Sequence, residues 1–173
     1  HVRSFNSEAN LVVLDDPTRG AVETCLYAES QINKDEGLVV LDCDLWFQSH
    51  EYLGLISNVL EGKRDLDGGI VYFNSTKPRY SYAEINNGLV VRTAEKKVIS
   101  SHALAGAYFF SRGDIFINAS KHLLRRSITT SMSEYYLSYL YNHLIEEGSQ
   151  IGAAKIDNYK SFGTPEELEN YTK

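Results

Sequence analysis

The sequence contains little of what defines several large protein classes. It has 2 cysteines in 173 residues, and 17 basic residues against 23 acidic ones. Two lone cysteines, Cys25 and Cys43, fit neither a disulfide framework nor a zinc site, and the shortage of Lys and Arg argues against a nucleic-acid-binding surface. No apolar run approaches the roughly 20 residues that cross a bilayer, and we recognise no signal peptide. We therefore expect a cytoplasmic protein with reduced thiols and no nucleic-acid or membrane partner.

What remains is the composition of an ordinary globular protein, with 43% hydrophobic residues, enough for one core. The chain opens with His1, and its first apolar run, at 11–14, follows no glycine-rich turn. We therefore expect residues 1–173 to form a single domain that is the C-terminal two-thirds of a complete one.

The order of apolar patterns predicts a layered α/β fold. A strand at 11–14, a helix at 21–32, a strand at 38–41 and a helix at 51–60 alternate, which implies right-handed parallel crossovers. Further strands are expected at 70–73, 80–85, 89–92, 103–110 and 151–156, with a hairpin turn at 86–88, and further helices at 112–124, at 132–147 and from Thr164 onward. The fold class is α/β, with a mixed, mostly parallel sheet flanked by helices.

Four apolar residues at 38–41 run directly into two carboxylates. The uninterrupted run predicts a strand covered on both faces, and Asp42 and Asp44 fall at its carboxyl end. In open α/β sheets ligands bind beyond these strand ends, so the pair is placed to hold a hard divalent cation against phosphate oxygens. The alternative is that Asp42 stabilises a turn and Asp44 caps the next helix. The local sequence is compatible with both.

Several further motifs occur in a particular order. They are D-D-P-T-R-G-A-V-E-T-C-L-Y-A at 15–28, the strand end at Asp44, A-E-K at 94–96, L-A-G-A-Y-F-F at 104–110 and F-G-T-P-E at 162–166. Together they resemble the sugar-1-phosphate nucleotidyltransferases, also called nucleotide-sugar pyrophosphorylases. No single motif is specific, but the resemblance covers nearly the whole chain. It implies a Rossmann-like, GT-A-like nucleotidyltransferase fold.

The resemblance also implies roles for individual residues. Asp44, with Asp42 beside it, would bind Mg²⁺ between the two reacting phosphates. Lys96 would contact the sugar phosphate and Glu95 the sugar hydroxyls, because an ammonium suits a phosphate and a carboxylate accepts from vicinal hydroxyls. The alternative for Glu95 and Lys96 is a solvated ion pair at a strand end.

Four more positions are carried over as substrate-binding residues: Gly20, Gly106, Tyr108 and Glu134. Gly106 interrupts a strand of bulky residues, which indicates close approach of a ligand or backbone, or else a bulge. Gly20 precedes a helix whose free amides attract polar groups, whereas its neighbour Arg19 also fits a surface position. Glu134 fits a helix-capping role as well.

The sequence departs from the family pattern at two places. The family's N-terminal glycine-rich loop, which cradles the triphosphate, is absent from these 173 residues. A second metal-binding Asp of the family is replaced by Ser161, a weak ligand for Mg²⁺. Asp157 could substitute for that Asp if its loop turned the side chain inward. We therefore expect this chain alone to be inactive.

These observations favour a nucleotidyltransferase that couples a sugar phosphate, or a similar small phosphorylated compound, to a nucleoside triphosphate and releases pyrophosphate. Such an enzyme would supply precursors for cell-surface polysaccharides and could form a homo-oligomer. One alternative is a GT-A-type glycosyltransferase that uses both Asp42 and Asp44 for a metal-bound nucleotide sugar. Another is a non-catalytic nucleotide-sugar-binding subunit. Neither the base nor the sugar can be read from the sequence.

Overall fold

A computed structural model describes residue 4, residues 6–129 and residues 132–169. Within them, six strands form one sheet in the order β1-β6-β3-β7-β5-β4. Their bounds are β1 Leu38–Leu41, β3 Gly68–Asn74, β4 Tyr82–Asn86, β5 Leu89–Ala94, β6 His102–Phe110 and β7 Ile151–Lys155. A further pairing, Tyr82 with Ala103, joins β4 back to β6, so part of the sheet closes on itself as a small barrel.

The mixed α/β class is confirmed, but the sheet is not mostly parallel. Among the strand pairs of the described residues, β3 with β7 runs parallel and all the others run antiparallel. The reason is local for β4 and β5, since a two-residue turn at Asn87 and Gly88 joins them, and so short a connection allows only antiparallel strands. The predicted hairpin at this turn is confirmed.

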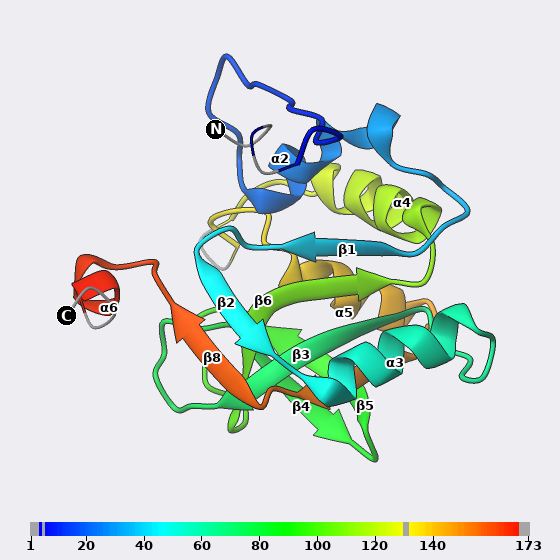
Figure 1. The fold of residues 1–173 in the computed structure, drawn as a ribbon, viewed down its shortest axis with the longest axis vertical. Helices are drawn as coiled ribbons and strands as arrows, with labels where there is room; N and C mark the ends of the chain where they lie inside the picture. Colours follow the sequence, from blue (N-terminus) through cyan, green and yellow to red (C-terminus); the bar gives the residue numbers. More distant parts are fainter. Residues whose placement is uncertain (1–3, 5, 130–131, 170–173) are drawn as a thin grey trace.

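Helices cover both faces of the sheet (Figure 1). Helix α3 (His50–Leu60) packs on one face, and α2 (Ala21–Leu26), α4 (Gly113–Leu124) and α5 (Ser138–Glu146) pack on the other. Strand β6 separates the two cores. Its Tyr108 and Phe110 point to the α4 and α5 side, whereas Ala107 and Phe109 point to α3. This alternation follows from the two-residue period of a strand, and burial on both faces explains why β6 is apolar along most of its length.

Three of the expected elements differ from the structure. Residues 11–14 form no strand, because no described strand pairs with them, and Val13 is 83% exposed. The helix expected at 21–32 ends at Leu26 and is followed by a short 3-10 turn, Glu29–Gln31. The helix expected from residue 132 begins at Ser138, since the Tyr135 backbone instead pairs with Arg19 and Val22. The remaining expected strands lie within two residues of their predicted bounds.

Strand β1 is an edge strand, and the prediction that both of its faces are covered is wrong, because its side chains are alternately half-buried and exposed. It pairs with β6 on one side, and in the described part of the chain no strand lies on its other side. Val39 and Leu41 point to the same face of β1 and are exposed by 41% and 54%, so this face is not fully covered. An apolar run reads the same whether its second face is buried or not, which is why the sequence could not show this.

Beyond β1 the chain forms a feature that the sequence did not predict. Strand β2 (Leu45–Gln48) pairs with β8 (Asn158–Ser161) in a separate two-stranded ribbon. Helix α3 is capped by Ser49, whose Oγ accepts the Tyr52 N–H at 3.0 Å. The alternative role of Asp44 as the helix cap is therefore wrong. The last of the described residues form α6 (Pro165–Glu169), where a terminal helix was expected. No helix of the described residues is long and apolar enough to span a membrane.

Candidate functional site

A cavity of about 290 Å³ lies where the end of β1 meets β6, β8 and the loops before β4 and after β5. Its walls carry four tyrosines, three carboxylates and one guanidinium, from Tyr80, Tyr108, Tyr136, Tyr159, Asp42, Asp44, Glu95 and Arg79. A larger hollow of about 480 Å³ beside α3 is lined mostly by apolar side chains and offers no comparable chemistry. We take the first cavity as the candidate site because its walls include five of the residues that the sequence indicated.

Asp42 is fixed to β6 at Gly106. Its N–H donates to the Gly106 carbonyl at 2.9 Å, and the register of β6 against β3 shifts between Ile70 and Tyr72, opposite this glycine. Gly106 has φ 73°, and a Cβ there would overlap the Asp42 carboxylate. The bulge expected at Gly106 agrees with this register shift, whereas the close approach is not that of a ligand or a second backbone. What approaches it is the carboxylate of Asp42.

The three carboxylates of the cavity repel one another. Burial raises the pKa of Asp42 to about 6, and the charges of Asp44 and Glu95 add to that shift. Burial also raises the pKa of Glu95, although hydrogen bonds from Ser81 and Ser138 oppose this shift. The Ser138 Oγ lies 3.1 Å from Glu95 Oε2, and the Ser81 hydroxyl donates to the same oxygen. Glu95 is therefore held in one orientation, and the cavity favours a cation beside Asp42.

Asp42 and Asp44 are the side chains of this cavity that could hold a hard divalent cation. Mg²⁺ is commonly bound by one or two carboxylates, with waters and substrate phosphates as its other ligands. The described residues form no cluster of three or more metal-ligating side chains, so a protein-only cage is not the arrangement here. Ser161 lines the same cavity. Asp157 does not, because it accepts hydrogen bonds from His50 instead, so the prediction that it could replace Ser161 is wrong.

Lys96 and Glu134 lie beside the cavity and do not line it. The Lys96 Nζ donates to the Tyr136 hydroxyl at 2.8 Å and sits 5.0 Å from the centre of that ring. Tyr136 itself lines the cavity, so Lys96 is one side chain removed from it. Glu134 is close enough for its charge to raise the pKa of Lys96, after the larger effect of the Tyr136 hydroxyl.

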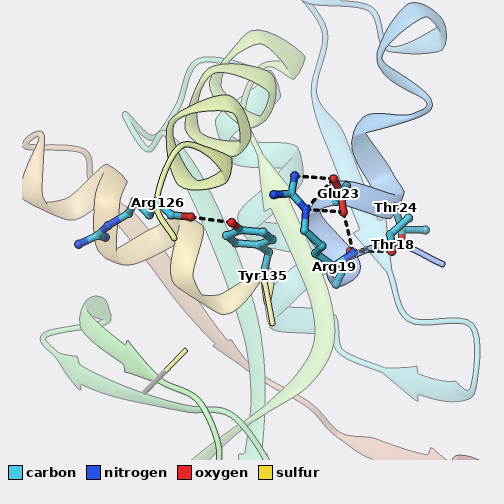
Figure 2. A network of polar contacts seen from close by, with 7 residues as sticks. Thr18, Arg19, Glu23, Thr24, Arg126 and Tyr135 are labelled. Atoms are coloured by element: carbon cyan, nitrogen blue, oxygen red, sulfur yellow. Dashed lines mark hydrogen bonds and ion pairs between the residues drawn. The ribbon is translucent and has the colours of Figure 1, made fainter. Parts of the chain in front are cut away.

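Gly20 also lies next to the cavity, which its neighbour Ala21 lines. A Cβ on Gly20 would overlap the Tyr135 backbone, so this glycine lets the start of α2 pack against the loop before α5. Figure 2 shows that the Arg19 guanidinium turns to Glu23, with which it forms an ion pair of 2.6 Å. It also lies 5.1 Å from the centre of the Tyr135 ring. This geometry agrees with the surface interpretation of Arg19.

The structure thus brings together five of the residues expected in the site: Asp42, Asp44, Glu95, Gly106 and Tyr108. Sequence reasoning missed Arg79, Tyr80 and Tyr159. Tyr159 belongs to the unpredicted strand β8, and burial raises its pKa to about 12, so it stays a neutral hydroxyl. Arg79 and Tyr80 follow Pro78 in a loop, and nothing in that local pattern separates them from ordinary surface residues.

Comparison with solved structures shows the fold family. The chain resembles a nucleoside-diphosphate-sugar pyrophosphorylase from Vibrio cholerae RC9, with a TM-score of 0.77 and 24% identity, over 91% of this chain and 66% of that one. It also resembles a protein assigned as a glucose-1-phosphate thymidylyltransferase from Bacillus anthracis, with a TM-score of 0.69 and 17% identity, over 91% of this chain and 61% of that one. This chain therefore has a sugar-nucleotidyltransferase-like fold and spans less than two thirds of the length of either structure.

No protein-family model matches the chain, and no curated protein matches it in sequence. At these identities the likeness defines the fold and leaves the reaction to be argued from the site.

We expect Gly106→Ala to destabilise the protein by about 1–3 kcal/mol, because alanine is strained at this positive φ and its methyl group displaces Asp42. Urea denaturation at pH 7 measures this loss. Gly54→Ala in α3 is the matched control, since a Cβ there meets nothing within 4 Å and alanine favours a helix. Equal stability of Gly106→Ala and the unchanged protein would contradict the close approach.

We expect the titration of Asp42 to contribute a decrease in the free energy of unfolding as the pH rises from about 4 to about 6. The pKa of Asp42 is raised in the folded protein from 3.8 to about 6, so in this window the folded state holds a proton that the unfolded chain has lost. Because Asp42 retains contact with solvent, the change is at most about 1 kcal/mol. Asp42→Asn should remove this contribution, so that in urea melts with a chelator its free energy of unfolding rises relative to the unchanged protein over this pH window, whereas Asp16→Asn, on an exposed loop, should show no such relative rise. An unaltered slope in Asp42→Asn would contradict this account.

Proposed function

We propose that the chain is the acceptor-binding and metal-binding part of a nucleotidyltransferase. It would couple a sugar phosphate, or a similar small phosphorylated compound, to a nucleoside triphosphate and release pyrophosphate, in the synthesis of polysaccharide precursors. One observation carries this proposal: Asp42 and Asp44, at the end of β1, open into a cavity whose other walls hold Glu95 and four tyrosines. The fold shared with two structures named as sugar nucleotidyltransferases supports it.

The residues of the chain would act by positioning and by charge. An oxygen of the acceptor phosphate attacks the α-phosphorus of the triphosphate in line, the bond to the β-phosphate breaks, and pyrophosphate leaves. Asp42 and Asp44 would hold Mg²⁺, which neutralises charge between the two phosphates. Glu95, fixed by Ser81 and Ser138, would accept hydrogen bonds from hydroxyls of the acceptor. Such positioning is sufficient for this chemistry, because phosphoryl transfer needs little covalent help from side chains.

The tyrosines give the cavity faces suited to a sugar ring or another compact organic group. Burial raises the pKa of Tyr108, and the charges of Asp42 and Glu95 add to this shift, so its hydroxyl stays protonated and can donate. Tyr136 connects the cavity to Lys96 through their hydrogen bond. Lys96 would contact the acceptor phosphate, the role that the family resemblance implies for it, from this position next to the cavity wall.

A glycosyltransferase is the second candidate, because both Asp42 and Asp44 line the cavity and such a pair also suits the diphosphate of a metal-bound nucleotide sugar. The products separate the two. Pyrophosphate released from a triphosphate supports our proposal, whereas nucleoside diphosphate released from a nucleotide sugar supports the second candidate. Calorimetric binding of nucleotide sugars without turnover would instead indicate a non-catalytic subunit. Assays of the complete protein with panels of triphosphates and sugar phosphates make this test.

In the complete protein we expect Asp44→Ala to lower pyrophosphate release by about 10²-fold or more, because a lost metal ligand removes several kcal/mol of charge stabilisation. Its thermal melting temperature should change little, since the Asp44 side chain lies at the cavity wall and the backbone carbonyl that accepts from Phe162 is retained. Asp157→Ala, outside the cavity, is the matched control. Near-normal turnover of Asp44→Ala would refute the metal assignment.

A further inference from the structure

Arg79 is the one cationic side chain among the described residues that line the cavity. It lies in the loop between β3 and β4 and is 44% exposed. Its guanidinium stacks 4.7 Å from the centre of the Tyr80 ring and donates to the Tyr80 hydroxyl at 2.5 Å. A guanidinium braced in this way keeps its orientation toward the cavity, because the aromatic face and the hydroxyl both restrain it.

Arg79 also contacts a carboxylate from helix α6, far along the sequence. Glu167, on α6, forms an ion pair with the Arg79 guanidinium and also accepts from the Ser161 hydroxyl at 2.8 Å. Helix α6 buries none of its described residues, and it lies beyond β8, apart from the main sheet (Figure 1). Its attachment to the cavity therefore rests largely on polar contacts, in which Glu167 takes part twice.

These contacts lie at the Asp44 end of the cavity. The residue after Ser161, Phe162, donates its N–H to the Asp44 carbonyl at 2.8 Å. A Cβ on Gly163 would lie 2.7 Å from the Asp44 Oδ2 and 3.8 Å from the Glu167 Oε2. Glu167 is thus an anion placed next to the carboxylate that would hold the metal, and Arg79 is the cation that binds it there.

We propose that Arg79 binds the phosphate of the acceptor, and that Glu167 occupies its guanidinium until this phosphate arrives. The inference rests on the proposed function and adds a residue and an exchange to it. A carboxylate and a phosphate both accept paired hydrogen bonds from a guanidinium, so one anion can replace the other without rebuilding the cavity. Because α6 has no buried residue, its release exposes little apolar surface and opposes the exchange weakly.

The exchange explains how a cavity with three carboxylates could accept an anionic substrate. Before binding, the charge of Arg79 is cancelled by Glu167. When the phosphate displaces Glu167, the positive charge of Arg79 binds the phosphate instead. The phosphate then lies beside Asp44, where the proposed reaction requires it. The device also selects for phosphorylated acceptors, because a neutral sugar has no group that competes with the Glu167 carboxylate for Arg79.

Calorimetric titration with inorganic phosphate and with glucose 1-phosphate, at constant ionic strength and with Mg²⁺, tests the proposal. We expect Arg79→Gln to raise the dissociation constants of both by about 10- to 100-fold, since this is the loss of affinity expected when hydrogen bonds to a charged group are removed. Glu167→Gln should strengthen both by about 3- to 10-fold, because the competing anion is lost. The binding of glucose should not change in either variant. Arg92→Gln removes an exposed ion pair with Glu84 and is the matched control.

Wild-type affinity for phosphate in Arg79→Gln, or no gain in Glu167→Gln, would overturn the proposal. If Arg79→Gln did not fold, Glu167→Gln alone would still decide. Phosphate binding that depends on Arg79, in a complete protein that releases no pyrophosphate from any triphosphate, would refute the proposed function and leave the phosphate site standing. If the complete protein released pyrophosphate, and Arg79→Gln changed neither phosphate binding nor turnover, the phosphate site would be refuted and the proposed function would stand.

Discussion

The contact between Asp42 and Gly106 is the constraint on which the site depends. The backbone hydrogen bond joins the end of an edge strand to the most buried strand of the sheet, and the absence of a side chain at Gly106 lets the carboxylate lie against β6. Asp42 is thereby held near Asp44 and Glu95. The three carboxylates therefore repel one another, and a cation bound beside Asp42 would relieve this repulsion. Packing and ligand preference are thus two consequences of one close approach.

Charge balance then explains the rest of the cavity. Its three carboxylates would repel an anionic substrate if no cationic side chain lay close to the cavity. Arg79 is paired with Glu167, and Lys96 is held by Tyr136 at the rim. Either cation can bind a phosphate once its present polar contact breaks. These contacts are exposed, and such contacts are weak in water. In this interpretation the metal would neutralise the carboxylates near Asp42, and the two cations would bind phosphate. The tyrosines would contact the uncharged part of the acceptor.

The sequence predicted those parts of the fold and site that depend on local chemistry. The Asn87-Gly88 turn, helix α4 and the strand end carrying Asp42 and Asp44 are determined by residues next to one another in the chain. The sheet direction, the edge position of β1 and the ribbon of β2 with β8 depend on pairings between distant segments, which leave no local pattern. Arg79 was missed for the same reason, because its partner Glu167 lies 88 residues away. Gly106 was recognised as special, but only the structure shows that its neighbour is Asp42.

Titration with Mn²⁺, a paramagnetic substitute for Mg²⁺, followed by amide NMR, is the most direct test of the central claim that a divalent cation binds at the end of β1. The account predicts saturable binding that first broadens the signals of Asp44, Gly106 and Phe162, and the loss of this broadening in Asp44→Ala. Broadening spread over the acidic surface, or an unchanged response in Asp44→Ala, would contradict it.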